Sequence, residues 1–154
     1  MREILFRGKT FHGDWIYGDL VQTNGKTGDG WAIQYYDTEN GWMTEDVQQQ
    51  SIGQFTGLVD SKKVRIYEGD VVHAYLSEYD RLDRFRVKMN LPKYYKGVVV
   101  YNERQCKFEV MFEVNDQCGD HHLLSCEFGW GHEKFIVVGK YIDKPFKLQN
   151  DVRI

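Results

Sequence analysis

The stretch TGLVDSKKVRIYEGDVVHAY, residues 56–75, is the most organised part of this chain of 154 residues. It contains a polar turn after a T-G-L-x-D phrase, and then a glycine between two carboxylates that separates two apolar runs. Glycine takes the positive φ that a sharp bend requires, and an aspartate accepts hydrogen bonds from nearby backbone N–H groups. The pattern predicts a hairpin followed by a bent entry into a strand. The residues assigned to these turns are Gly57, Asp60, Glu68, Gly69 and Asp70.

Glu68 and Asp70 are also a candidate acid–base or metal-binding pair, because two carboxylates flank one glycine. Such chemistry needs another acid or base within reach. Along the sequence, only Asp60 and His73 come near. The structural interpretation explains every residue of the motif without catalysis, so we prefer it.

Strand signals dominate the rest of the chain, and the predicted fold class is mainly β. Short runs of β-branched and aromatic residues are broken by Gly, Asp and Asn, which is typical of an all-β domain. In the run KFEVMFEV, apolar residues alternate with Glu109 and Glu113, which fall on the other face of the strand. The segments predicted as strands are Glu3–Arg7, Trp15–Gln22, Trp31–Tyr36, Gly53–Gly57, Val71–Leu76, Gly97–Tyr101, Phe108–Val114 and Phe135–Tyr141.

Residues 77–91 are the one segment with a helical pattern. Leu82, Phe85 and Met89 are spaced by three and four residues, and Ser77 is a suitable N-cap. The segment separates two strands that could otherwise pair directly. We therefore expect one domain over residues 1–154, with an insertion at about residues 77–96 that carries a short helix or an ordered loop.

Composition and charge limit the class of protein. Apolar residues make up 42% of the chain and the net charge is −3, which argues against a protein that coats DNA. No run approaches the length of a membrane span, and the start of the chain lacks the apolar stretch of a secretory signal. Three cysteines fit a reducing compartment better than a disulfide framework. These features predict a cytoplasmic protein.

The insertion is the leading candidate for a binding surface, because it interleaves cations with aromatic rings. Cations and stackable rings on a β scaffold suit single-stranded nucleic acid. Contact with a protein partner and a solvated insertion packed on the domain are the alternatives. The candidate binding residues are Arg81, Arg84, Phe85, Arg86, Lys88, Tyr94 and Lys96.

The segment CGDHHLLSC, residues 118–126, is a candidate metal site. Zinc needs three or four ligands, normally supplied as two closely spaced pairs. Cys118 and His121 form one such pair, but Cys126 has no close partner. The same residues could supply the Cys/His pair of a hydrolase, or form a polar turn followed by a strand with a buried cysteine.

Other signs of catalysis are weak. No nucleophile elbow, Walker loop or dinucleotide fingerprint occurs in the sequence, so we expect no cofactor and no enzymatic activity. Tryptophans in small β domains usually belong to the core or its rim rather than to a ligand platform. The tryptophans are Trp15, Trp31, Trp42 and Trp130.

The phrases T-G-L-x-D and I-Y-E-G-D-V-V, here residues 56–60 and 66–72, resemble the signature of the YopX family of phage and prophage proteins. The start MREILFRG and the closing VVGKYIDKPFKL are also similar to that family. Residues 77–96 and 115–130 stand outside the resemblance. Lys62 and Lys63 occupy a turn in which a glycine is usual.

The resemblance implies a small, bent, SH3-like β barrel encoded by a phage or an integrated element, and it implies no catalytic residues. Together with the reading of the residues, it predicts a non-catalytic binding module in the cytoplasm of a bacterial host. A protein partner is the first expectation and single-stranded nucleic acid is the alternative. Open sheet edges would also allow a homo-oligomer.

Overall fold

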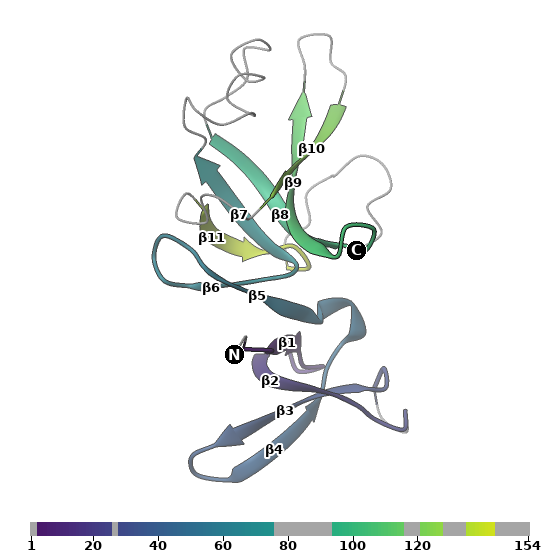
Figure 1. Ribbon diagram of the computed structural model, residues 1–154. Helices are drawn as coiled ribbons and strands as arrows, with labels where there is room; N and C mark the ends of the chain where they lie inside the picture. The colour runs from purple at the N-terminus through teal and green to yellow at the C-terminus, as the bar shows by residue number, and fades with distance from the viewer. Residues whose placement is uncertain (1–2, 26–27, 76–93, 116–120, 128–134, 144–154) are drawn as a thin grey trace. The chain divides into compact units, whose positions relative to one another are not determined.

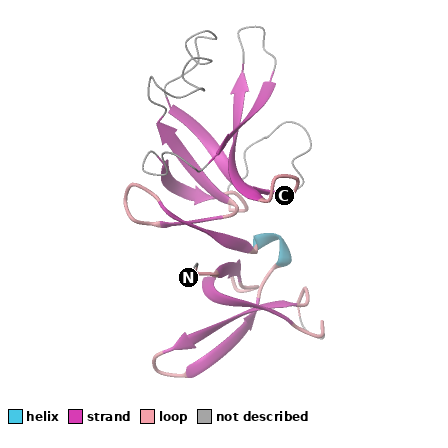
Figure 2. Cartoon of the chain, viewed as in Figure 1, coloured by secondary structure: helices cyan, strands magenta, loops and turns pink. Residues whose placement is uncertain are grey.

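The structure is a computed structural model that describes residues 3–25, 28–75, 94–115, 121–127 and 135–143. Within these residues the chain is mainly β, as the sequence predicts, and carries only a short 3₁₀ helix, η1 (Gln49–Ser51), beside its strands (Figures 1 and 2). The strands are β1 (Phe6–Lys9), β2 (Trp15–Gln22), β3 (Trp31–Asp37), β4 (Gly41–Asp46), β5 (Gly53–Val59), β6 (Arg65–Tyr67), β7 (Asp70–Tyr75), β8 (Tyr94–Asn102), β9 (Lys107–Asn115), β10 (His121–Glu127) and β11 (Phe135–Lys140).

The strands form two antiparallel sheets. One has the order β4-β3-β2-β1-β5-β6 and the other has the order β10-β9-β8-β7-β11. Each order has two ends, so the described strands do not close into a barrel. The chain also divides into two compact units, Met1–Gly57 and Leu58–Ile154, and the division falls inside β5.

The core of the first unit contains residues of β3 and the residue that follows β4. Ala32, Ile33 and Val47 have no exposed surface. A Cβ atom added to Gly18 would lie 2.0 Å from the backbone oxygen of Gln34, so β2 and β3 approach more closely than any side chain at residue 18 would allow. Val47, which follows β4, forms an isolated antiparallel β-bridge with Thr10, which follows β1.

The core of the second unit centres on β8, which pairs with β7 on one side and with β9 on the other. Its valines 98 and 99 are fully buried and Val100 is nearly so. The continuously apolar run GVVVYN is therefore covered on both faces of the sheet. Val72 and Val110, on the neighbouring strands, are also fully buried.

Glu109 lies in β9 on the face opposite the apolar residues, and it is nevertheless buried. Its carboxylate is compensated locally: Asn102 donates a hydrogen bond of 3.1 Å from Nδ2, and the Lys107 ammonium lies 3.3 Å away. A buried charge is tolerated when such partners replace water.

The predicted strands are present, with shifted ends. Trp15–Gln22 is confirmed residue for residue, whereas β1 begins at Phe6 rather than at Glu3. The strand predictions omitted β4, β6 and β10, although one interpretation of residues 118–126 placed a strand after a polar turn. Gly41 and three polar residues mask the apolar signal of β4, and β6 has only three residues.

The predicted helix at residues 77–91 lies outside the described residues, whereas residues 94–96 form the start of β8. In the part of the chain that the structure describes, no helix is both long and apolar enough to cross a membrane.

Candidate functional site

The Asp60 carboxylate is buried in the turn between β5 and β6, with 2% of the residue exposed. Its Oδ1 accepts hydrogen bonds from the backbone N–H groups of Lys62 at 2.8 Å and Val64 at 2.9 Å. Its Oδ2 accepts a third, at 2.9 Å, from the N–H of Val137 in β11. Asp60 therefore joins a local turn to a strand that is distant in sequence.

These hydrogen bonds set the ionisation of Asp60. Burial alone raises the pKa, but the donors from Val137, Val64 and Lys62 outweigh it, and the pKa lies below its usual value. Hydrogen bonds to a charged carboxylate favour the charged form. Asp60 thus stays ionised, with its oxygens occupied by backbone donors.

The Glu68-Gly69-Asp70 turn is also tied to backbone. Asp70 is 1% exposed, and its Oδ2 accepts a hydrogen bond of 2.8 Å from the N–H of Tyr67. Gly69 has φ 77°, its N–H donates to the oxygen of Val99, and its own oxygen accepts from the N–H of Tyr141. Glu68 is half-buried beside it.

Gly57 lies inside β5 and not in the turn itself, with φ 87°. The turn instead takes its positive φ at Lys63, where φ is 66°. A lysine therefore adopts the left-handed conformation that glycine takes most readily. The left-handed region costs a non-glycine residue roughly 1–2 kcal/mol.

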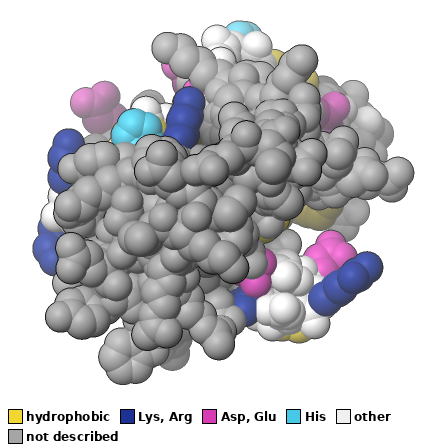
Figure 3. All heavy atoms as spheres, turned by 90° about the horizontal axis from the view of Figure 1, so that it is seen from above, with side chains coloured by type: hydrophobic (Ala, Val, Ile, Leu, Met, Phe, Trp, Pro, Cys, Tyr) yellow, Lys and Arg dark blue, Asp and Glu magenta, His cyan; other side chains and the backbone are white. Residues whose placement is uncertain are grey.

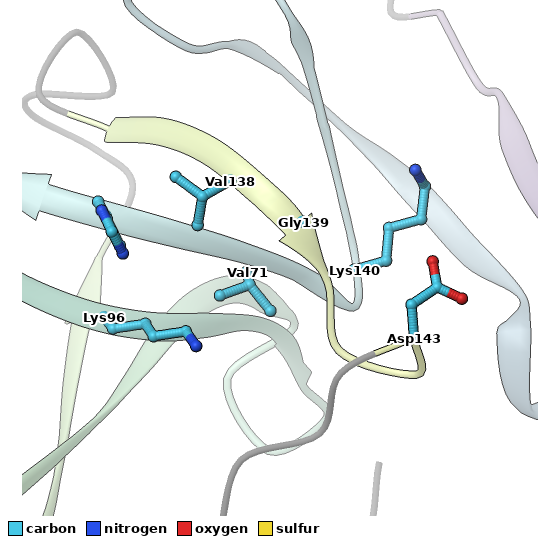
Figure 4. Close-up of a pocket in the computed structure, with 7 residues that line it drawn as sticks. Val71, Lys96, Val138, Gly139, Lys140 and Asp143 are labelled. Carbon is cyan, nitrogen blue, oxygen red and sulfur yellow. The ribbon is translucent and has the colours of Figure 1, made fainter.

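A hollow of about 440 Å³ is lined by residues of β7, β8 and β11, neighbouring strands of the second sheet, and by Asp143 after β11 (Figure 4). This volume lies within the range of ligand pockets. Val71 and Val138 lie in the middle of the close-up, with Lys96 on one side and Lys140 and Asp143 on the other. The described residues that line the hollow are Val71, His73, Lys96, Val138, Gly139, Lys140 and Asp143.

A β-bulge in β11 shapes this hollow. The pairing of β11 with β7 runs from Val137 opposite Val72 directly to Gly139 opposite Val71, so Val138 is the extra residue. Val138 is 47% exposed, whereas Val71 is 3% exposed. Bulges bend a strand and redirect side chains, and they are frequent beside functional sites.

The polar lining consists of two lysines, one histidine and one aspartate. Lys96 lies opposite His73 in the pairing of β8 with β7, and both are exposed. Lys140 adds a second ammonium group, and Asp143 is the only carboxylate among the described lining residues. Figure 3 shows a histidine beside a lysine or arginine on the face that it presents. The hollow therefore combines positive charge with two valines.

Of the candidate binding residues, Lys96 is the one that the structure brings to this hollow. Tyr94 is the first residue of β8 and pairs with Tyr75. The others, Arg81, Arg84, Phe85, Arg86 and Lys88, lie outside the described residues.

Of the Cys/His candidate residues, two lie within the described part of the chain and one lies outside it. His121 is the first residue of β10, opposite Asn115, and Cys126 lies five residues further along, opposite Val110. Cys118 lies outside the described residues. Among the described residues, no group of three His, Cys, Asp or Glu side chains is arranged to hold a metal ion. The metal interpretation stays a prediction.

Sequence reasoning missed the hollow, because its residues come from three separate segments. The one local signal was Gly139 inside an apolar strand pattern, which often marks a bulge. Nothing in the sequence specified that the bulge would face His73 and Lys96.

Comparison with known proteins gives one negative and one positive result. No curated protein matches the chain. The family model described as YopX protein matches residues 5–149, nearly the whole length, and confirms the resemblance to that family. The chain belongs to the YopX family.

Proposed function

We propose that this protein is a non-catalytic binding module for a protein partner, and that an acidic segment of the partner docks in the hollow on β7, β8 and β11. The observation that carries the proposal is the pair of lysines, Lys96 and Lys140, on either side of the Val71 and Val138 side chains.

The chemistry of the hollow defines the ligand. The ammonium groups of Lys96 and Lys140 attract carboxylates, and the valines offer apolar contact to a neighbouring aliphatic side chain. Interfaces combine an apolar centre with a charged rim in this way. An extended segment that alternates acidic and aliphatic residues satisfies both parts of the hollow.

The absence of catalysis is part of the proposal. Asp60 and Asp70 are the buried aspartates of the signature stretch, and both accept hydrogen bonds from backbone N–H groups. A general acid or base must instead exchange protons with a substrate. The family resemblance carries no catalytic residues either.

Single-stranded nucleic acid is the second candidate ligand. The exposed Lys96 favours it, because Lys96 belongs to the segment at about residues 77–96 that interleaves cations with aromatic rings. Bases are held by stacking on aromatic rings. Among the described residues that line the hollow, none is aromatic, except for the imidazole of His73. The acidic protein segment is therefore the better fit.

The finer assignments of fold and origin belong to the same proposal. We infer an SH3-like fold for a phage or prophage protein that acts in the bacterial cytoplasm. The family resemblance and the five antiparallel strands of the second sheet support the fold. An experimental structure of the full chain tests it.

Binding of a short fluorescein-labelled peptide of alternating Glu and Val tests the function by fluorescence anisotropy. The double variant Lys96→Ala/Lys140→Ala should weaken binding about tenfold, since each surface ion pair contributes up to about 1 kcal/mol. Arg104→Ala is a matched single-charge control, because Arg104 is exposed in the turn between β8 and β9, outside the lining. It should change affinity little.

Three results would overturn the proposal. One is equal binding by the wild type and the double variant. Another is no binding of the peptide by the wild type. The third is binding of a labelled single-stranded oligonucleotide, but not of the peptide, with a steep dependence on salt. This last result would favour the nucleic acid candidate.

A further inference from the structure

Two aromatic rings stand exposed on the hairpin formed by β3 and β4, in the first unit. Tyr36 and Trp42 lie opposite each other in the register, and 63% and 67% of their surfaces are exposed. Their ring centroids are 5.6 Å apart, with an angle of 77° between the ring planes. The rings form a corner with two aromatic walls, which we call the aromatic corner.

The hairpin that carries the aromatic corner is held by local hydrogen bonds. In its turn, Asp37 Oδ1 accepts hydrogen bonds from the N–H groups of Glu39 at 3.0 Å and Asn40 at 2.8 Å. Tyr35 donates a hydrogen bond from its hydroxyl to Glu45, across the two strands. The rings are thus presented by a pre-formed element, which lowers the entropy cost of binding.

The side chains of this hairpin carry negative charge and no positive charge from lysine or arginine. Residues 31–47 contain four carboxylates and no lysine or arginine. Beside the rings, the Gln34 amide donates a hydrogen bond of 3.5 Å to the Thr44 hydroxyl, so the neighbouring cross-strand pair is neutral. The four carboxylates are Asp37, Glu39, Glu45 and Asp46.

The outer edge of β4 gives access to the aromatic corner. β4 ends the order of its sheet, so among the described strands it pairs only with β3. Edge strands are usually blunted with lysine or proline, and β4 has neither. A second copy of the chain would bring the same four carboxylates to this edge, and like charges placed opposite each other are destabilising.

We propose that the aromatic corner binds a basic, arginine-containing segment of a partner protein. An arginine side chain stacks on the Trp42 ring as a cation–π contact, and the carboxylates of the hairpin attract the remaining cations. Trp and Tyr are the residues that most often anchor protein interfaces. The surface lies in a different unit from the hollow and takes ligands of the opposite charge, so the two proposals stand independently.

The alternative is that the rings only stabilise the hairpin. Cross-strand aromatic pairs contribute to sheet stability by themselves. In that case, removal of Trp42 would lower the melting temperature and leave the binding of a basic peptide unchanged. Nucleic acid is a poor occupant, because residues 31–47 carry four carboxylates and no lysine or arginine, and these charges repel phosphates.

A short fluorescein-labelled peptide of alternating Arg and Thr is the probe, with the full chain at low salt. Trp42→Ala should weaken binding by about five- to tenfold, the size expected for loss of one cation–π contact. Trp42→Phe keeps a ring and should retain most of the affinity. The matched control is Tyr101→Ala, since Tyr101 and Phe108 form a similar edge-to-face pair at 5.2 Å in the other unit.

The proposal fails if the wild type does not bind the peptide, or if Trp42→Ala binds it within about twofold of the wild type. It also fails if Tyr101→Ala weakens binding as much as Trp42→Ala does. Should Trp42→Ala not fold, Trp42→Leu and Tyr36→Thr replace it, because each removes a ring, and an affinity equal to the wild type in both would overturn the proposal. The Glu–Val peptide reports on the hollow separately.

Discussion

Asp60 accepts a hydrogen bond of 2.9 Å from the backbone N–H of Val137, which lies 77 residues further along the chain. Val137 immediately precedes Val138 and Gly139, the bulge residues that line the hollow. The signature stretch therefore holds the strand that shapes the candidate site, although Asp60 is not among the residues that line it.

Asp60→Ala should lower the free energy of unfolding by roughly 3 kcal/mol, because it leaves three backbone donors without their charged acceptor. Urea denaturation at neutral pH measures this change. The acidic peptide should also bind more weakly to the folded variant, since the bulge loses its anchor at Val137. Unchanged stability would contradict the role of Asp60 as a structural link.

Stability should fall in acid through Asp60. Its pKa is lower in the folded protein than in the unfolded chain, where an aspartate titrates near about 4. A group with a lowered pKa contributes stability above the unfolded value and loses it as pH falls through the folded value. Urea denaturation from pH 7 to acid should show this loss below about pH 4. In Asp60→Asn, the free energy of unfolding should depend less on pH below about pH 4. A dependence on pH identical to that of the wild type would contradict the account.

Lys63→Gly should stabilise the protein. Lys63 holds φ at 66°, and the left-handed region costs a side-chain-bearing residue roughly 1 kcal/mol. Glycine removes that strain, so we expect a gain of about 0.5–1 kcal/mol in urea denaturation. Lys62→Gly is the matched control and should destabilise slightly. A loss of stability in Lys63→Gly would show that the turn changes conformation.

Gly18→Ala and Gly139→Ala should differ sharply. The added methyl at residue 18 would meet the backbone oxygen of Gln34 at 2.0 Å, and backbone cannot move aside cheaply. We expect a loss of about 3 kcal/mol or more there. At residue 139 no atom of the described residues lies within 4 Å of the added methyl, so the change should stay within about 0.5 kcal/mol. Thermal denaturation of both variants measures the contrast, and similar melting temperatures would contradict it.

Much of the fold could be predicted because strands leave local signals. The run Trp15–Gln22 is rich in aromatic and β-branched residues, and valines 98–100 form a continuous apolar stretch, so both were identified from sequence. β4 was not predicted, because a glycine and acidic residues are typical of a loop. The resemblance indicated a glycine in the turn after Asp60, and so a positive φ there. Which of the two lysines adopts it depends on the hydrogen bonds that the N–H groups of Lys62 and Val64 donate to Asp60.

The candidate surfaces were harder to predict. Trp42 is exposed, whereas Trp15 and Trp31 are half-buried, and no local pattern separates these three tryptophans. Trp130 lies outside the described residues. The hollow depends on a bulge and on a strand register that join residues 71–73, 96 and 138–143. No single segment of the sequence predicts such pairing between distant strands.

The most direct test of the proposed function is an NMR titration of the isotope-labelled full chain with the Glu–Val peptide, followed by amide chemical shifts. We predict that the largest changes occur at Lys96, Val138, Gly139 and Lys140, and that the amides of Tyr36 and Trp42 do not move. Changes confined to other residues, or no changes at saturating peptide, would contradict the assignment of the hollow as the binding site.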